Sequence, residues 1–124
     1  MTQRWLWSFG CAAALGGAAA LTGCGGFPPP NTHMATAMSS VRAASEVGAE
    51  KDPQAALHLK LAQEQLDQAK QLMNDGDNKR ADFVLSRAEA DAELAVAQAR
   101  EADMRSQAQA ALDKLSALKQ RSGR

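Results

Sequence analysis

Residues 52–102 read DPQAALHLKLAQEQLDQAKQLMNDGDNKRADFVLSRAEADAELAVAQAREA, and this stretch decides the fold. Asp52-Pro53 is a typical helix start, with an N-cap carboxylate followed by proline at the first helical position. Apolar residues then recur at alternating steps of three and four, at Leu59, Ala62, Leu66, Ala69 and Met73, and Leu57, Leu61 and Leu72 widen the stripe. This spacing predicts an amphipathic helix over about 53–74.

A compact turn follows this helix. In Asn74-Asp75-Gly76-Asp77 the glycine can adopt positive φ, and Asp77 can cap a new helix. That second helix should cover about 78–120, because small residues recur at heptad spacing at Ala81, Leu85, Ala88, Ala92, Ala95, Ala99 and Ala102. The two helices are expected to form a long antiparallel hairpin that resembles a coiled coil.

The heptad pattern changes phase after Ala102. Beyond it, Met104, Ala108, Ala111, Leu115 and Leu118 continue the spacing two positions out of register, as at a coiled-coil discontinuity. At about 1.5 Å per residue this helix approaches 65 Å, about twice the length of its partner. Part of it should overhang, and the strongest apolar anchors for a partner helix are Met104, Leu112, Leu115 and Leu118. Alternatively, the first helix of the domain covers these residues.

The segment before the hairpin predicts a short third helix over about 34–47. Asn31 or Thr32 can cap it, and Gly48 should end it. Its apolar stripe contains Met34, Ala37, Met38, Val41, Ala44 and Ser45. No strand pattern occurs after Thr32, so the fold class is all-α, with a helical domain over 34–120 and a tail over 121–124.

Residues 24–33 form a Gly/Pro-rich tether between this domain and the preceding segment. Two glycines give flexibility, and Pro28-Pro29-Pro30 favours extended polyproline geometry of about 3.1 Å per residue. Such a segment can serve as a polyproline ligand for a binding partner, but a spacer between the preceding segment and the helical domain is favoured.

The first 23 residues are typical of a secretory signal peptide. Arg4 supplies a positive start, residues 6–21 carry no charge, and small residues precede Cys24. About 16 apolar or small residues are too few for a comfortable membrane span, which needs roughly 20. Cleavage is therefore expected.

The sequence Leu21-Thr22-Gly23-Cys24 resembles the lipobox of bacterial lipoproteins. The resemblance implies that signal peptidase recognises Leu21, Thr22 and Gly23, and that the Cys24 sulfur carries diacylglycerol. It also implies an acyl chain on the new Cys24 amine. Cys11 fits this pattern poorly, and the remaining alternative is an ordinary signal cleavage that leaves a free thiol on Cys24.

Lipidation would fix both compartment and membrane attachment. Acyl chains contribute about 0.8 kcal/mol per buried methylene, so two or three hold a protein durably at a membrane. Gly25 stands where, by resemblance to enterobacterial sorting rules, aspartate would retain a lipoprotein in the inner membrane. The expected location is the periplasmic face of the outer membrane rather than the inner membrane.

Composition and motifs argue against catalysis and nucleic-acid binding. The chain has 14 basic and 14 acidic side chains and 4% aromatic residues, which is not the basic, aromatic pattern of a nucleic-acid surface. His33 and His58 are isolated in sequence, and the cluster Glu89, Asp91, Glu93 should spread around its helix. We expect no catalytic residues, no metal site, no enzyme activity, and no cofactor besides the lipid on Cys24.

Several of these features together resemble one family. The lipobox, the alanine-rich helix ending near Gly48, the restart at Asp52-Pro53, and AEADAELA at 88–95 are similar to the small lipoproteins of domain-of-unknown-function family 4398. The family has no assigned chemistry. Some members resemble modules joined to a peptidoglycan-binding domain of the outer-membrane-protein-A type, and this chain stops before any such domain.

These observations together predict a lipid-anchored periplasmic protein that acts as a non-enzymatic structural or adaptor element of the cell envelope. It would pair through coiled-coil seams with other envelope proteins or with itself, and a position near peptidoglycan is compatible. The alternative is a lipoprotein that binds a small molecule between its helices, in a pocket lined by Met34, Met38 and Met73.

Overall fold

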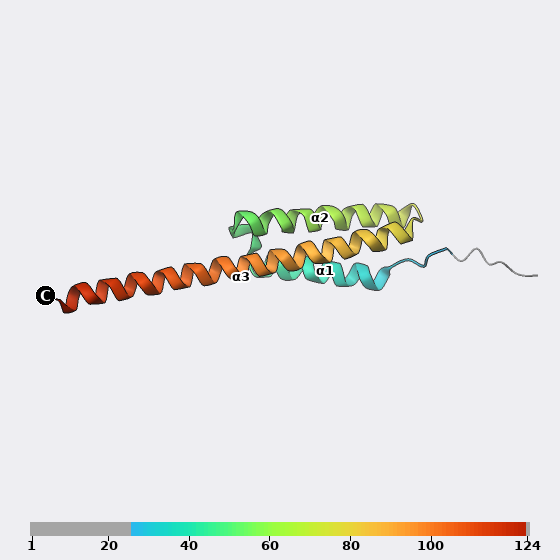
Figure 1. Cartoon of the computed structure of the whole chain (residues 1–124). Coiled ribbons are helices and arrows are strands. Elements are labelled where there is room, and N and C mark those ends of the chain that lie inside the picture. The colour runs from blue at the N-terminus through green and yellow to red at the C-terminus, as the bar shows by residue number, and fades with distance from the viewer. Residues whose placement is uncertain (1–25, 124) are drawn as a thin grey trace, which may run out of the picture.

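The computed structural model describes residues 26–123, which form three α-helices and one short 3-10 helix (Figure 1). These are α1 (Asn31–Glu46), η1 (Ala49–Lys51), α2 (Pro53–Asn74) and α3 (Asn78–Ser122). No strand occurs within this part of the chain. The all-α prediction of a short helix followed by a long hairpin is therefore confirmed. The signal peptide and the lipobox, Leu21 to Cys24, lie outside the described residues.

The two shorter helices both lie along the first half of α3 (Figure 1). α2 runs antiparallel to α3 and α1 runs parallel to it, so the start of α1 lies beside the α2–α3 turn. At this end the Asn78 side-chain amide donates a hydrogen bond of 2.8 Å to the carbonyl oxygen of Phe27. The chain therefore enters the bundle at the turn end.

α1 begins at Asn31, earlier than the start near residue 34 that the sequence suggests. Pro30 occupies the N-cap position, and no side chain caps the helix, so the expected cap by Asn31 or Thr32 is wrong. Proline suits the N-cap because the backbone donor that it lacks would have no partner within the helix there. Residues 31–33 are thus helical, and the tether is shorter than expected.

The other helix boundaries follow the turn chemistry of the sequence. The Asp52 carboxylate caps α2 by accepting from the amides of Gln54 (3.0 Å) and Ala55 (2.9 Å). Gly48 and Gly76 both adopt positive φ, at 77° and 78°. At the second of these turns the amide of Asp77 donates to the Leu72 carbonyl at 2.8 Å, which closes a Schellman motif.

Alanine dominates the interface among the three helices. One core cluster near the turn contains Ala37 of α1, Leu66, Ala69 and Leu72 of α2, and Ala81, Val84, Leu85 and Ala88 of α3. A second, at the other end of the bundle, contains Ala44, Ala49, Ala55, Leu59, Ala95 and Ala99. Most residues of the predicted stripes that face the bundle are buried. The half-buried members are Met34, Val41, Ser45, Leu61, Met73 and Ala102. Leu57 and Met38 are 56% and 45% exposed. Those two residues lie at the outer edges of their stripes, where α3 does not reach.

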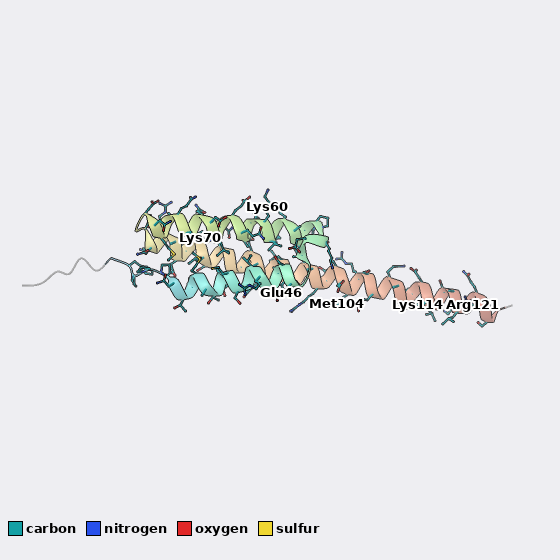
Figure 2. The ribbon with its side chains drawn as sticks, turned by 180° about the vertical axis from the view of Figure 1, so that it is seen from behind. Glu46, Lys60, Lys70, Met104, Lys114 and Arg121 are labelled. Carbon is teal, nitrogen blue, oxygen red and sulfur yellow. The ribbon has the colours of Figure 1, made fainter. Side chains whose placement is uncertain are left out.

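The second half of α3 projects alone beyond the bundle (Figure 2). Every residue from Asp103 to Gly123 is exposed. With 45 residues α3 is about 68 Å long, whereas α2 with 22 residues is about 33 Å long. The predicted overhang is therefore present, and Arg121 and Ser122, expected in the tail, belong to the helix. We call residues 103–122 the free half of α3.

Candidate functional site

The free half of α3 carries the four residues that the sequence predicts as partner anchors. Met104, Leu112, Leu115 and Leu118 are 63%, 60%, 49% and 61% exposed. The alternative that the first helix covers them is wrong, because the last buried residue of α1, Ala44, packs with Ala95 and Ala99. These large apolar side chains have no cover from the described chain.

The exposed apolar face extends along the bundle as well. Phe83 and Leu94, on the part of α3 that carries α1 and α2, are 68% and 42% exposed. An unbroken alternation of four- and three-residue steps joins them to the free half, through Phe83, Arg87, Ala90, Leu94, Ala97, Glu101, Met104, Ala108, Ala111, Leu115 and Leu118. All of these residues are exposed. We call this series the outer seam.

The outer seam lies on the side of α3 opposite the bundle core. At 3.6 residues per turn, the nine positions between Ala95 and Met104 correspond to about two and a half turns. Ala95 is fully buried in the core, so Met104 points roughly the other way. A partner on the outer seam would therefore meet neither α1 nor α2.

The change of phase after Ala102 now has a structural explanation. α3 is one continuous helix, and the buried series ends near Ala102 because the bundle ends there. The outer seam runs past this point without interruption. Sequence reasoning missed Phe83 and Leu94, although extending the spacing backwards from Met104 identifies both.

Charge divides the flanks of the outer seam into two regions. Beside its first half lie Asp91, Glu93 and Arg100. Glu89 and Asp103 lie on the bundle side of the helix, where Glu89 meets His33 and Asp103 lines a recess with Val47 and Gly48. Beside its second half lie Arg105, Lys114, Lys119 and Arg121, with Asp113 on the far side of the helix. Arg105 pairs with Glu101 one turn earlier, whereas Lys114, Lys119 and Arg121 form no ion pair with any described residue. Lys114 and Arg121 project from the free half in Figure 2.

A histidine of α1 bridges two carboxylates of α3. His33 Nδ1 lies 2.8 Å from Asp82 Oδ1, and its Nε2 lies 3.4 Å from Glu89 Oε2. Asp82 and Glu89 are seven residues apart, so they share one face of α3 on either side of the imidazole. This contact fixes the axial position of α1 along α3.

A second bridge joins α2 to α3 on the other flank. Asp91 of α3 accepts at one oxygen from His58 (2.9 Å) and at the other from Gln65 (2.8 Å). His58 and Gln65 are seven residues apart on α2, which places the carboxylate between them. The side chains of His58 and Asp91 are both about three-quarters buried. The sequence suggested no convergence for Glu89 and Asp91, but each meets a histidine, and only Glu93 stays exposed.

These polar contacts have the character of structural bridges. Each consists of hydrogen bonds between helices at the edge of the core. Within residues 26–123 no group of three or more His, Cys, Asp or Glu residues is arranged to hold a metal ion.

A surface recess of about 300 Å³ lies where α3 leaves the bundle. It is lined by Val47, Gly48, Lys51, Asp52, Ala99, Ala102, Asp103 and Ser106. The three methionines of the predicted ligand pocket are elsewhere: Met34 and Met73 pack against the core cluster near the turn, and Met38 is exposed.

A comparison with protein families places the chain. The model of the family described as "Domain of unknown function (DUF4398)" matches residues 32–111, which include α1 except its first residue, η1, α2 and most of α3. The chain belongs to this family. No curated protein and no solved structure matches. No helix among the described residues of this DUF4398 protein combines the length and apolar character that crossing a membrane requires.

Proposed function

We propose that this DUF4398 protein is a non-enzymatic structural or adaptor element of the bacterial cell envelope, anchored to a membrane through lipid on Cys24. The observation that carries the proposal is the outer seam, an apolar heptad face exposed along a helix of 45 residues. Large apolar side chains exposed in a row are typical of surfaces that bind another molecule. A heptad face in particular fits another helix.

The position of the anchor supports this role. Phe27, three residues after Cys24, is hydrogen-bonded through its carbonyl at the turn end of the bundle. The free half of α3 points in the opposite direction (Figure 1). A lipid on Cys24 would therefore hold one end of the molecule and leave Met104 to Leu118 far from the attachment point. We place the protein at the periplasmic face of the outer membrane, on the sequence of the lipobox and Gly25.

Metabolic labelling with a fatty-acid probe tests the anchor. Wild-type protein should incorporate the label and fractionate with membranes, whereas Cys24→Ser should lose the label and accumulate as unprocessed precursor. Cys11→Ser is the matched control and should leave labelling unchanged. Mass spectrometry that finds an intact precursor or an unmodified secreted product of the wild-type chain would overturn the proposal.

Photo-crosslinking in cells tests the pairing surface. A photoreactive amino acid at Leu115, on the outer seam, should capture a protein neighbour. The same group at Lys60, which is exposed on α2 outside the seam, is the control and should capture little. Equal capture at the two positions would contradict a dedicated role for the seam.

A further inference from the structure

The charges of the residues that flank the outer seam indicate which partner can bind there and in which orientation. Residues beside a heptad seam face the partner helix and choose its direction by charge. Here the acidic and basic flanks follow one another along a single helix. A partner that matches both must offer basic residues to the first half and acidic residues to the second half.

We propose that the outer seam pairs with the outer seam of a second copy of this chain, in antiparallel orientation. This inference names the partner of the proposed function and rests on its pairing surface. An antiparallel copy brings its basic free half beside the acidic first half, and the reverse holds at the other end. A parallel copy would place Arg100 beside the partner's Arg105 and Lys114 beside the partner's Lys119, which is destabilising.

One register satisfies both packing and charge. When Leu94 faces the partner's Ala111, Ala90 faces the partner's Leu115, because four residues back along one helix correspond to four residues forward along its antiparallel partner. These two layers each combine a large and a small side chain, the alternation by which helix faces interdigitate. In the layers nearer the centre of the pair, Ala97 faces the partner's Ala108 and Glu101 faces the partner's Met104. In this register Glu93 lies beside the partner's Lys114. Arg100 and Arg105 lie beside the partner's Gln107 and Gln98, so no like charges face each other across the flanks.

The polar members of the outer seam are compatible with this arrangement. Glu101 is neutralised within its own chain by Arg105. Arg87 faces the partner's Leu118, where its aliphatic stem can cover apolar surface while the guanidinium stays in water. Isolated polar residues in a seam lower affinity and select one register.

The shape of the molecule accommodates the pair. α1 and α2 occupy the face of α3 opposite the outer seam, so the two bundles lie on the two outer sides of the pair. The free half of each copy then covers Leu94 of the other, and its last turn lies beside Phe83, so exposed apolar surface is reduced at both ends. A foreign helix with a single sign of charge would match only one half of the seam.

Charge exchange in the full-length lipidated protein tests this proposal. The oligomeric state is measured by sedimentation equilibrium in a density-matched detergent. Wild type should form a dimer, and Glu93→Lys and Lys114→Glu should each weaken it about tenfold, because symmetry repeats the altered pair twice. The double variant should recover affinity to within about threefold of wild type. Positions 93 and 114 are about 31 Å apart along α3, so recovery can come only from another copy.

Apolar substitutions provide the second measurement. Leu115→Asp should abolish the dimer without unfolding the exposed free half, and Leu57→Asp, at an exposed leucine of α2 outside the seam, should not. A monomer at all concentrations, additive effects in the charge-exchanged double variant, or equal effects of Leu115→Asp and Leu57→Asp would overturn the inference. If Cys24 labelling and capture of a different protein at Leu115 persist in that case, only the second copy fails as the partner, and the proposed function stands.

Discussion

Alanine occupies most of the buried apolar positions of this bundle, and that choice sets how much each larger side chain contributes. Leu85 is the largest side chain that is fully buried. It lies in the cluster where all three helices meet, beside Ala37 and Ala88. Alanine side chains are too short to rearrange into the cavity that a truncated leucine would leave. The few buried leucines therefore contribute a large share of the stability.

Leu85→Ala is therefore expected to lower the free energy of unfolding by about 2–4 kcal/mol, because it removes buried methylenes and leaves a cavity. Leu57→Ala, at the exposed leucine of α2, should change it by less than about 0.5 kcal/mol. Urea denaturation followed by circular dichroism measures both. Similar losses for the two variants would contradict the burial pattern of the bundle.

The Asp91 bridge is the second residue-scale feature with a measurable consequence. Asp91→Ala leaves His58 and Gln65 without their partner at the edge of the core, and we expect a loss of about 1–2 kcal/mol. The comparison is Asp67→Ala, which removes an exposed ion pair with Lys70 at 2.8 Å and should cost at most about 0.5 kcal/mol. Chemical denaturation of the two variants, with m-values compared, would separate these cases; equal losses would argue against a structural role for the bridge.

At the scale of elements, the two halves of α3 differ in what stabilises them. Its first half is held by α1 and α2, whereas the free half has only its own backbone hydrogen bonds and side-chain pairs one turn apart. Most helical stability in proteins comes from tertiary packing, which the free half lacks. We infer that the free half is the least stable part of α3 until it is paired.

Removal of residues 104–124 tests this division. The truncated chain should unfold with a free energy within about 0.5 kcal/mol of the full-length monomer, because every removed residue that the structure describes is exposed. Thermal and urea unfolding at concentrations below dimer formation provide the measurement. A loss greater than about 1 kcal/mol would show that the free half contributes to the bundle.

The same scale shows what the sequence predicts and what it does not. Helix ends at Gly48 and Gly76 and the start at Asp52 follow from local chemistry, because a positive φ or a cap needs a particular residue type. The start of α1 differs, since Pro30 occupies the N-cap position and no side chain caps the helix, although the sequence predicts a cap by Asn31 or Thr32. The predicted burial of Leu57 is wrong, because the part of α2 that α3 covers depends on the angle at which the two helices cross.

The histidine bridges and the first half of the outer seam are less accessible from sequence. Contacts of His33 with Asp82 and of His58 with Asp91 depend on the rotation and axial shift between helices, which local spacing does not specify. The outer seam is regular, but alanine, Arg87 and Glu101 dilute its pattern in the bundle. Only the free half, where large side chains dominate, identifies it directly.

At the scale of the whole molecule, the three helices make an elongated body with distinct ends (Figure 1). The chain enters at the turn end, and the C-terminal end of α3 lies at the opposite tip. The antiparallel pair that we propose would place two entry points at opposite ends of one assembly. With lipid on both copies of Cys24, that assembly would lie along the membrane rather than stand on it.

The parallel course of α1 and α3 has a mechanical consequence. A pull between the N-terminal end of α1 and the far tip of α3 acts along the interface, so both core clusters and the His33 bridge resist it simultaneously in shear. Peeling the same helices apart would break those contacts one after another. A chain fastened at one end and gripped at the other is thereby built to withstand tension along its long axis.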